Sequence, residues 1–538
     1  MAFKEYKGLD LVATGNEVLD RWKKNHAFEK SLELREGAPE FIFFEGPPSA
    51  NGMPGIHHVM ARSIKDAICR YKTQSGYKVN RRAGWDTHGL PVELGVEKML
   101  GITKEDIGTK ISVEEYNDAC RKEVMKYTAE WVNMTERVGY WVDMNDPYIT
   151  YDNRYIETLW YLLKNIYDKG LLYKGKSIQP YSPAAGTGLS THELNQPGCY
   201  RDVKDTTAVA QFAVIRDGKS EFLFEQGVPA YILAWTTTPW TLPSNTALCV
   251  GPNIDYVRVL SFNPYTGQPA LYVVAQALVN AHFNPKAAEV AFEDYKPGDK
   301  LVPFKVLEGT MKGSELTGIR YEQLIPWFNP GEGAFKVIPG DYVTTEDGTG
   351  IVHIAPTFGA DDAKVARLAG VPGLQVVDRN GDLQAQVDLR GRFFRIEDLD
   401  PEYAAANMSA DYAEWAGRYV KNAYDAELPA DAPTLDVDIC VMLKQQNKAF
   451  RIEKHTHNYP HCWRTDKPVL YYPLNSWFIK TTAVRERMME LNEQIMWKPE
   501  STGTGRFGKW LENIQDWNLS RSRYWGTPLP IWQTEDGK

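Results

Sequence analysis

The stretch from residue 40 to residue 71 constrains the fold of this chain more than any other part. It consists of an apolar run from Phe41 to Phe44, a loop with the sequence EGPPSANGMPG, and the segment IHHVMARSIKDAICRY. In the last segment, apolar side chains recur at helical spacing, at Val59, Met60, Ile64, Ala67 and Ile68. We therefore expect a strand, a loop and a helix, followed by a second strand in YKVNRR. This order is typical of the opening of a parallel α/β sheet that binds a nucleotide.

Two changes of pattern divide the rest of the chain. Before about residue 198 helical signals dominate: Ser112 and Glu115 form a capping box before a stretch that reaches about Val138, and Asp152 begins a helix that ends near Gly170. From about residue 200, short β-rich runs predict a separate β-barrel or β-sandwich insertion, in TTAVAQFAVI, AYILAWTTTPW, YVRVLSF, ALYVVAQALV and GTGIVHIAP. After about residue 440 helical patterning returns.

Composition limits the compartment and the partners. The chain of 538 residues is long enough for several domains, and its six scattered cysteines form no CxxC pair, as expected in a reducing compartment. The start, MAFKEYKGLDLV, has no apolar signal core, and no apolar run approaches the roughly 20 residues that a bilayer requires. We expect a cytoplasmic protein with no membrane partner. The net charge of −9 means that a nucleic acid would need local basic patches, whereas the clusters Arg70/Lys72 and Lys78/Arg81/Arg82 are interpreted as solvated faces.

The loop before the predicted helix ends in Gly55-Ile56-His57-His58. A loop that enters a helix presents free backbone N–H groups and the positive end of the helix dipole to an anion. Imidazole groups therefore lie where phosphates would bind. Two adjacent histidines by themselves favour a structural or metal-ligating role over a position beside phosphates.

The order of several motifs resolves this ambiguity. EGPPSANG, GIHH, RSIKD and GWDTHGLPVE follow one another in the order found in class I aminoacyl-tRNA synthetases, and Gly84 to Glu93 resembles the isoleucyl members rather than the valyl or leucyl ones. The resemblance runs from about residue 6 to the last residue. It implies an α/β protein whose Rossmann-type nucleotide-binding fold is interrupted by a large β-rich, barrel-like editing insertion. The expected parts are residues 1–198 and 441–538 for the catalytic domain and 199–440 for the insertion.

The resemblance also assigns roles in the activation of isoleucine by ATP with Mg²⁺ and its transfer to tRNA(Ile). Asp86 would hold the ammonium group of isoleucine, which is a charge-assisted pair, although an aspartate here could also simply cap the following turn. The remaining amino-acid pocket residues would be Pro47, Gly84, Trp85 and His88. Pro48, Asn51, Gly52 and His58 would contact ATP, and Gly55, His57 and His58 would form the catalytic signature, which works by positioning and charge stabilisation.

This signature departs from the family pattern. The usual order is His-x-Gly-His, whereas here the first histidine and the glycine are exchanged. The glycine normally lets ATP lie close to the backbone, so a histidine in its place should crowd the adenine. We hypothesise that the loop is reshaped and that His57 takes over part of the role of the missing first histidine. Unchanged ATP–pyrophosphate exchange after Gly55→His with His57→Gly would contradict this hypothesis.

A second constellation lies in the β-rich insertion. The run from Trp235 to Asn245 contains five hydroxyl groups and an amide, although a threonine-rich run by itself is more often simply a β-strand. Far downstream, GTGIVHIAPTFGADD supplies His353 and Asp362. These segments resemble the two walls of the isoleucyl editing pocket, in which threonine hydroxyls orient water and the terminal adenosine and Asp362 would fix the ammonium of a mischarged amino acid. The implied editing residues are Thr236, Thr237, Thr238, Thr241, Asn245, His353 and Asp362.

Such a pocket has an energetic reason. Isoleucyl enzymes are an established example of this limit. The methylene that valine lacks contributes only about 1–3 kcal/mol of binding free energy, so a second, hydrolytic site must supply the remaining discrimination against valine. A positioned water suffices for hydrolysis, without a covalent nucleophile or a metal.

A zinc site is not expected. In many relatives a CxxC near the start of the insertion pairs with a CWRC at its end, but here the corresponding positions are Ser182 and Ala185, then Cys462 and Thr465. One remaining thiolate cannot make a structural tetrahedral site, so stoichiometric zinc would contradict this prediction.

Two further family elements, a GxDQxRGWF-like strand and the KMSKS loop, do not occur before Lys538. We therefore expect a truncated chain that activates amino acids poorly and retains hydrolytic editing. With the family resemblance we also expect a monomer. The motif from Asp516 to Gly526 is interpreted as mainly architectural, and a position of its arginines near tRNA or phosphate remains open. Valyl or leucyl specificity is opposed by GWDTHGLP and TTTPWTLPSN, and a catalytically silent tRNA-binding or regulatory paralogue remains open. A metal-dependent hydrolase remains a further alternative, built from His57, His58, His88, His353, His455, His457 and His461, although no HExxH-like spacing joins them.

Overall fold

The computed structural model describes residues 8–429 and 432–534, so the first residues of the opening segment lie outside it. The chain forms two compact units. Residues 1–172 and 523–538 make the first unit, and residues 173–522 make the second. The predicted boundaries after residues 198 and 440 both fall within the second unit. No described helix is long and apolar enough to span a membrane.

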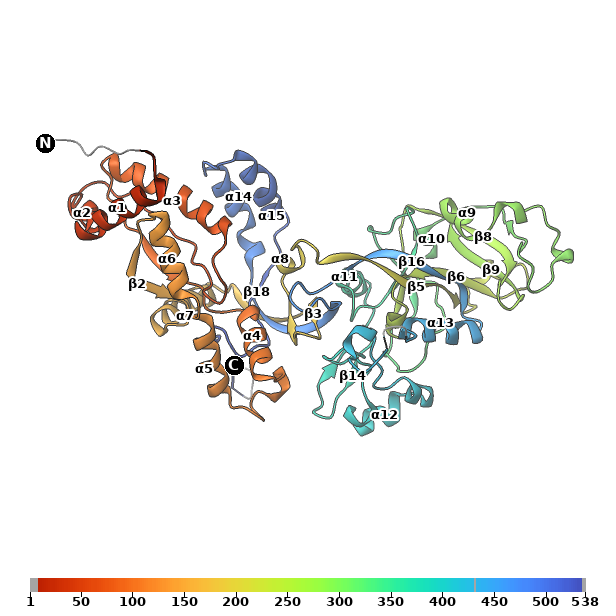
Figure 1. The fold of residues 1–538 in the computed structure, drawn as a ribbon. Helices are drawn as coiled ribbons and strands as arrows, with labels where there is room; N and C mark the ends of the chain where they lie inside the picture. The colour runs from red at the N-terminus through yellow and green to blue at the C-terminus, as the bar shows by residue number, and fades with distance from the viewer. Residues whose placement is uncertain (1–7, 430–431, 535–538) are drawn as a thin grey trace. The chain divides into compact units, whose positions relative to one another are not determined.

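The first unit is mostly helical around a small parallel sheet (Figure 1). Strands β1 and β2 pair in parallel, with Gly84 opposite Tyr148 and Trp85 opposite Ile149. The elements are α1 (Leu11–Lys24), α2 (Ala27–Glu33), α3 (Ile56–Gln74), β1 (Arg82–Trp85), α4 (Leu90–Leu100), α5 (Val113–Val124), α6 (Thr128–Val138), β2 (Asp143–Ile149) and α7 (Asn153–Asp168). The predicted helix after the glycine- and proline-rich loop is confirmed as α3.

The predicted starts of two helices in this unit are confirmed. Ser112 accepts a hydrogen bond from the Glu115 N–H, and the Glu115 carboxylate accepts one from the Ser112 N–H, so the capping box at the start of α5 is confirmed. Asp152 is the N-cap of α7. The stretch to Val138 is not one helix, however, because α5 ends at Val124 and α6 begins at Thr128.

The predicted strand from Phe41 to Phe44 is wrong for the described residues. Only a bridge between Glu40 and Lys78 forms there, and the side chains of Ile42 and Phe44 are 71% and 88% exposed. The strand expected in YKVNRR likewise begins later, at Arg82. An apolar run needs a pairing partner on both sides to become a central strand, and in the described chain Phe41 to Phe44 pair with nothing beyond this bridge.

The interpretation of the basic clusters as solvated faces is also wrong in part. The Arg81 side chain is buried, and its guanidinium donates to Thr73 Oγ1 at 2.7 Å and to the Trp141 carbonyl at 3.2 Å. Arg70 pairs with Asp66 and lies over the ring of Trp141. These two cations hold α3 to the segment that leads into β2.

The second unit contains the β-rich part of the chain. Ten of its described strands form one mixed sheet, in the order β10-β8-β9-β6-β13-β7-β12, with β11 on β8 and with β5 joining β6 and β16. The strands are β5 (Tyr200–Ala213), β6 (Ala230–Thr236), β7 (Ala247–Val250), β8 (Asp255–Phe262), β9 (Pro269–Ala275), β10 (Lys305–Val306), β11 (Met311–Lys312), β12 (Lys336–Pro339), β13 (Ile351–Ile354) and β16 (Ala449–Pro460). The five β-rich runs of the sequence all contain strands of this sheet.

The remaining elements of the unit form two smaller sheets and several helices. A second sheet has the order β18-β17-β3-β4, and β14 pairs with β15. These elements are β3 (Leu172–Ser182), β4 (Thr187–Gly188), α8 (Thr191–Leu194), α9 (Val279–His282), α10 (Gly313–Leu316), α11 (Ala360–Leu368), β14 (Val376–Val377), β15 (Leu383–Gln384), α12 (Pro401–Asn407), α13 (Leu435–Gln445), β17 (Leu470–Ile479), α14 (Arg485–Glu493), α15 (Gly508–Glu512) and β18 (Trp517–Asn518).

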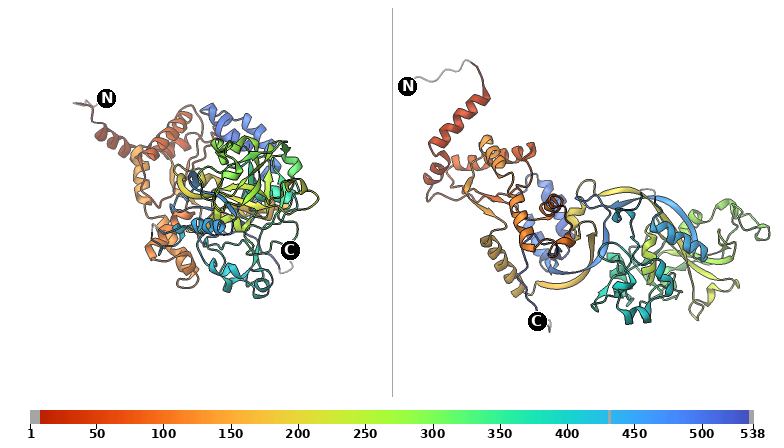
Figure 2. Two further views of the ribbon diagram at one scale, coloured as in Figure 1. Left: turned by 90° about the vertical axis from the view of Figure 1, so that its right-hand side faces the viewer. Right: turned by 60° about the horizontal axis from the view of Figure 1, so that its bottom comes forward.

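Strands β5 and β16 form a long antiparallel ribbon. They pair from Tyr200 opposite Pro460 to Ala210 opposite Ala449, and the two strands run side by side in Figure 1 and in the right-hand view of Figure 2. At the end of the ribbon, the His461 N–H donates to the Cys199 carbonyl at 2.7 Å. The segment between these residues therefore begins and ends at neighbouring points of the backbone. A large hydrophobic cluster that includes Val209, Leu233, Leu443 and Tyr472 and a smaller one that includes Ala247 and Ile354 form the core of the unit.

Candidate functional site

The threonine-rich run adopts a turn between two strands. Strand β6 ends at Thr236, and a short 3₁₀ helix covers Pro239–Ser244. The Thr236 hydroxyl accepts a hydrogen bond from the Thr238 N–H at 3.1 Å, and the Thr238 carbonyl accepts one from the Thr241 N–H at 3.0 Å. Because prolines lack an N–H and fix φ, Pro239 and Pro243 favour this short helix over a continued strand. The run is thus a shaped turn and not a uniform strand.

Downstream residues form the facing wall. Strand β13 pairs with β6 through Val352 and Trp235, which places His353 beside the threonine turn. Asp362 lies in the first turn of α11, where the helix dipole favours a negative charge. Its Oδ2 accepts a hydrogen bond from the Ala355 N–H at 2.8 Å. A Cβ at Gly359 would lie 2.6 Å from Asp362 Cγ, so this carboxylate needs glycine at the helix N-cap.

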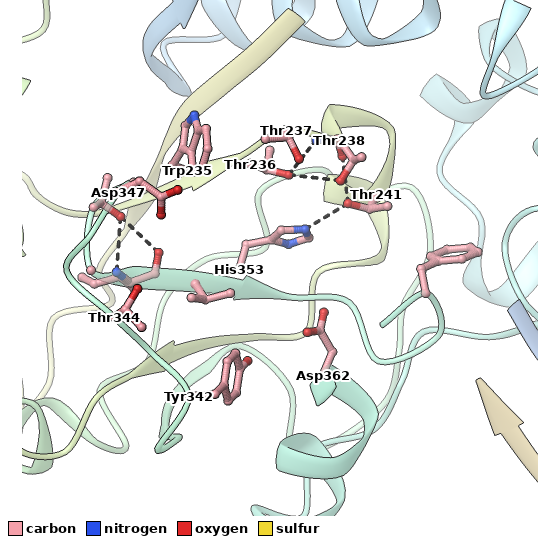
Figure 3. A pocket seen from close by; sticks show the side chains of 16 residues that line it. Trp235, Thr236, Thr237, Thr238, Thr241, Tyr342, Thr344, Asp347, His353 and Asp362 are labelled. Atoms are coloured by element: carbon pink, nitrogen blue, oxygen red, sulfur yellow. Dashed lines mark hydrogen bonds between the residues drawn. The ribbon is translucent and has the colours of Figure 1, made fainter. Parts of the chain in front are cut away.

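These two walls enclose a cavity of about 340 Å³. Figure 3 shows the threonines and His353 along one side and Asp362 directed into the same space from α11. Six of the seven residues expected for editing line it: Thr236, Thr237, Thr238, Thr241, His353 and Asp362. The structure thus brings together two segments that lie more than 100 residues apart in the sequence.

Asn245, the seventh, does not line the cavity. It is buried behind His353, where Tyr321 Oη donates to its Oδ1 at 2.7 Å and its Nδ2 lies 3.3 Å from His353 Nδ1. Nδ2 also donates to the Ala247 carbonyl at 2.8 Å. Asn245 therefore holds the histidine ring in place and does not face the cavity.

The hydrogen bonds around His353 specify its protonation. Since Asn245 Nδ2 is a donor, His353 Nδ1 is the acceptor and Nε2 carries the proton. Nε2 lies 3.0 Å from Thr241 Oγ1, which in turn donates to the Thr238 carbonyl at 2.8 Å. Burial lowers the pKa of His353 to about 4. His353 is therefore a neutral residue whose two ring nitrogens are both engaged.

Asp362 is electrostatically the opposite case. Burial raises the pKa of its carboxyl from 3.8 to about 6, against the Ala355 hydrogen bond, which lowers it. No lysine or arginine lines the described cavity, and the pKa of about 4 keeps His353 neutral. A cation entering the cavity would therefore find a carboxylate that lacks a counter-charge.

Three lining residues outside the two motifs, Tyr342, Thr344 and Asp347, were not indicated by the sequence. Asp347 lies beside Trp235 at the end away from Asp362 (Figure 3). Trp235, Gly348 and Gly350 also line the cavity, and they belong to the motifs although no editing role was assigned to them. Asp347 directly precedes the second motif, whereas no sequence signal marks Tyr342 or Thr344. Gly350 has a positive φ of 73°, and a Cβ there would lie 2.4 Å from Ala275 Cβ, so this wall of the cavity requires glycine.

In the first unit, the structure joins the glycine- and proline-rich loop to the GWDTHG segment. The Asp86 N–H donates to the Pro48 carbonyl at 2.9 Å, and half-buried Pro47 precedes this contact. Trp85 packs with Ala50 and Trp131 in one buried cluster. Trp131 also reaches the loop, since its indole N–H donates to the Gly52 carbonyl at 2.9 Å, close to Asn51.

The exchanged signature forms a compact pair of rings. Gly55 is the N-cap of α3, and its N–H donates to His58 Nδ1 at 2.8 Å. The rings of His57 and His58 lie 3.8 Å apart, and His58 lies 4.5 Å from the Trp131 ring. A Cβ on Gly55 would be 2.9 Å from His57 Cε1. The two exchanges are therefore linked, because glycine at position 55 lets the His57 ring lie where it does, and a side chain there would displace the ring.

The GWDTHG side chains differ in their surroundings. Asp86 is exposed in part, yet desolvation by neighbouring protein atoms raises its pKa, against a backbone hydrogen bond from His88 that lowers it. Burial lowers the pKa of His88 to about 4, and its ring lies 5.4 Å from Trp525. Gly84 has no space for a side chain, since a Cβ would lie 2.4 Å from the Tyr148 ring.

The positions that hold zinc in many relatives carry a different set of atoms. The Ala185 N–H donates to Ser182 Oγ, and Cys462 is fully buried. Thr465 Oγ1 is buried without a hydrogen-bond partner. Among the described residues no group of three or more His, Cys, Asp or Glu side chains is arranged to hold a metal.

Sequence comparison places the chain among known proteins. The family described as tRNA synthetases class I (I, L, M and V) matches residues 17–538. The chain belongs to this family. The isoleucine–tRNA ligase of Bacteroides fragilis is 70% identical over 99% of this chain and 46% of its own length, and that of Porphyromonas gingivalis is 68% identical over 99% and 47%. The chain thus spans about half the length of the curated relatives it matches. A comparison with solved structures matches the ternary complex of Agrobacterium radiobacter K84 agnB2 LeuRS, tRNA and LeuAMS. The match covers 97% of this chain and 51% of the LeuRS chain, with 15% sequence identity and a TM-score of 0.34.

Membership of the class I family confirms the resemblance drawn from the motifs. The structure adds a contact between two of these motifs that the sequence did not indicate. Glu93, at the end of the GWDTHGLPVE motif, is buried and accepts hydrogen bonds from Arg523 Nε at 2.8 Å and from the N–H groups of Tyr524 and Trp525. Arg523 also pairs with Glu97. Arg523 is therefore an architectural residue, as its motif was interpreted.

Proposed function

We propose that this chain forms part of an isoleucine–tRNA ligase and carries its editing pocket. The finer architecture belongs to this proposal: a Rossmann-type catalytic domain in residues 1–198 and 441–538, and a barrel-like editing insertion in residues 199–440. The observation that carries the proposal is the cavity in which Asp362 faces four threonines and His353. The identity of 70% to a protein named isoleucine–tRNA ligase supports the choice of amino acid.

The proposed reaction is hydrolysis of the ester in valyl-tRNA(Ile). A water oxygen forms a bond to the ester carbonyl carbon, the bond from that carbon to the ribose oxygen breaks, and a proton of the water passes to the ribose oxygen, which gives valine and a free ribose hydroxyl. Above pH 6 the Asp362 carboxylate is ionised and can hold the substrate ammonium, which would restore a lower pKa to the carboxyl. Threonine hydroxyls both donate and accept, so they can orient the water.

His353 has a supporting role in this proposal. Both ring nitrogens are occupied by Asn245 and Thr241, and the ring stays neutral at physiological pH. It is therefore poorly placed to act as a general base. We propose that it fixes the Thr241 hydroxyl, and that substrate positioning supplies most of the rate enhancement.

The activation site is the second part of the proposal. Asp86 would hold the isoleucine ammonium in a pocket with Pro47, Gly84, Trp85 and His88. ATP with Mg²⁺ would lie against Pro48, Asn51, Gly52 and the N-terminus of α3, with Gly55, His57 and His58. Gly52 fits this use because no heavy atom would lie within 4 Å of a Cβ there, which leaves open space beside the loop. His57 is exposed and near the helix N-terminus, so it fits the role left by the exchanged first histidine.

The remaining expectations stay proposals. We propose tRNA(Ile), isoleucine and ATP as partners of the longer enzyme, a monomeric state, a cytoplasmic location and no zinc. Because the chain spans 46% of the length of the B. fragilis relative, we propose that it hydrolyses mischarged tRNA but activates isoleucine poorly by itself. Robust ATP–pyrophosphate exchange by the chain would contradict the last point.

Deacylation of valyl-tRNA(Ile) tests the editing proposal. The wild-type chain should release valine faster than the uncatalysed rate, and Asp362→Ala should lower kcat/KM roughly 10- to 100-fold, the equivalent of one charge-assisted hydrogen bond. Asp361→Ala is the matched control, because Asp361 lies in the same helical turn, is exposed and does not line the cavity. Equal deacylation by the wild type and Asp362→Ala would remove the proposed role of Asp362.

A further inference from the structure

A carboxylate lies buried beneath the threonine turn. Asp436, in the first turn of α13, is 2% exposed, and its Oδ1 accepts a hydrogen bond from the Trp240 N–H at 2.9 Å. Trp240 is the second residue of the short 3₁₀ helix, where an N–H has no partner within the helix. Asp436 therefore completes the backbone hydrogen bonding of the threonine turn from 196 residues away.

One lysine balances this carboxylate and a second one. Lys421 Nζ lies 2.9 Å from Asp205 Oδ2 and 3.5 Å from Asp436 Oδ2. His457 Nε2 lies 3.3 Å from the same oxygen of Asp205, and the Lys421 ammonium lies 4.8 Å from the centre of the Tyr459 ring. Burial lowers the pKa of Lys421, but Asp436 and Asp205 outweigh burial and raise it. The network thus joins α13, β5 and β16 to the threonine turn.

Buried ion pairs are a costly way to hold a fold together. Moving charges out of water opposes folding, and well-packed apolar residues often give equal or greater stability. What a hydrogen-bonded charge provides instead is a defined position for its partner. Here the partner is a backbone N–H next to a residue that lines the cavity.

The geometry from Asp436 to the cavity is continuous. Trp240 precedes Thr241 directly, and Thr241 Oγ1 binds both His353 Nε2 and the Thr238 carbonyl. The Trp240 ring packs edge-on against Phe358, which lines the cavity, at 5.0 Å. A shift of the Trp240 backbone would therefore move the Thr241 hydroxyl and release the histidine ring.

We infer that Asp436 and Lys421 are positioning residues of the editing pocket, which set the threonine turn for hydrolysis without touching the substrate. This inference rests on the proposed editing function. It differs from a purely structural role in what it predicts, because a misplaced threonine wall lowers kcat for water attack. Asp362 would bind the substrate ammonium from the opposite wall of the cavity, so KM should change less than kcat.

The test compares three single variants of the chain. Asp436→Ala removes the acceptor for the Trp240 N–H, whereas Asp436→Asn keeps an oxygen at that place. Asp438→Ala is the matched control, since Asp438 lies on the same helix and pairs with Arg418, but it makes no contact with the threonine turn among the described residues. For each variant, kcat and KM of valyl-tRNA(Ile) deacylation and the thermal midpoint are measured.

We expect Asp436→Ala to lower kcat about tenfold or more with KM within about threefold of the wild type. Asp436→Asn should recover kcat to within about threefold, and Asp438→Ala should leave both parameters unchanged. An Asp436→Ala variant that keeps wild-type kcat, or equal losses for Asp436→Ala and Asp438→Ala at equal thermal midpoints, overturns the inference. An inactive wild-type chain fails at the earlier step and removes the proposed editing function, and this inference with it.

A double variant covers the case in which Asp436→Ala does not fold. Lys421→Met with Asp436→Leu removes one charge of each sign and fills the space with apolar groups, while Asp205 keeps its contact with His457. Such replacements are commonly tolerated in protein interiors. We expect this variant to fold and still to lose kcat about tenfold or more, because the Trp240 N–H lacks its acceptor. Wild-type kcat in the folded double variant would contradict the inference.

Discussion

Replacing Asp362 by asparagine should stabilise the protein at pH 8 and at the same time lower the rate of the proposed hydrolysis. Asparagine has the same shape and can still accept the Ala355 N–H hydrogen bond that Asp362 Oδ2 accepts at 2.8 Å. The change therefore removes the negative charge and little else. If Asp362 were a structural residue, the same change would leave stability equal or lower.

The magnitude follows from the pKa of the carboxyl. Burial raises it from 3.8 to about 6, and each pKa unit corresponds to about 1.4 kcal/mol, which gives an upper limit of about 3 kcal/mol. The sign follows from the direction. Because the folded state favours the protonated acid, the wild type loses stability as the pH rises from 3.8 to about 6 and stays at the lower value above pH 6. Since the asparagine amide is itself a buried polar group, we expect a gain of about 1–3 kcal/mol at pH 8.

Urea-induced unfolding at pH 4, 6 and 8 measures this difference. The gain for Asp362→Asn should be largest at pH 8, smaller at pH 6 and close to zero at pH 4. Asp361→Asn, at the exposed neighbouring position, should change the unfolding free energy by less than about 0.5 kcal/mol at every pH. An Asp362→Asn variant that is no more stable than the wild type at pH 8, or a gain that does not depend on pH, would refute the reasoning.

Three further predictions concern single residues. Burial lowers the pKa of His353 from 6.5 to about 4. The contribution of the neutral ring to stability is therefore complete above pH 6.5 and is lost as the pH falls towards 4. In urea titrations between these pH values, the wild type should lose up to about 3 kcal/mol more unfolding free energy than His353→Gln. Gly84→Ala should lower the unfolding free energy by about 1–3 kcal/mol, because its Cβ would meet the Tyr148 ring at 2.4 Å. Gly95→Ala, in open space within α4, should raise the unfolding free energy by up to about 1 kcal/mol. Equal effects of the two changes would contradict the proposed clash with Tyr148. Gly55→Ala should displace the His57 ring and shift the imidazole NMR resonances of both His57 and His58, while Gly52→Ala, which meets no atom within 4 Å, should leave them in place.

Local signals account for what the sequence predicted about the fold. The capping box of Ser112 and Glu115, the start of α7 at Asp152 and the five β-rich runs depend on residues within one or two turns of each other, and the structure contains each of them. The break between α5 and α6 was missed because the residues at 125–127 include neither glycine nor proline. The apolar run at Phe41 to Phe44 was mistaken for a strand because a run shows hydrophobicity but not whether a neighbouring strand is present.

Contacts between residues far apart in the sequence limit how much of the candidate site could be predicted. The threonine run and the GTGIVHIAP segment were joined through family resemblance, and the structure adds the reason, which is the pairing of Val352 with Trp235. No pattern in the sequence indicated that Asn245 stands behind His353 or that Asp436 reaches Trp240. The burial of Arg81 was missed for the same reason, since its partners Thr73 and Trp141 lie on other elements.

The ribbon of β5 and β16 has a consequence for how such a protein can be altered. Because the Cys199 carbonyl and the His461 N–H are hydrogen-bonded at 2.7 Å, the backbone enters and leaves the intervening segment at one place. Removing that segment would leave two backbone ends that a tight turn could join, although side-chain contacts such as that of Tyr472 Oη with the Val387 carbonyl would be lost. A paired ribbon of this kind lets the length of the intervening segment change while its two backbone connections stay adjacent.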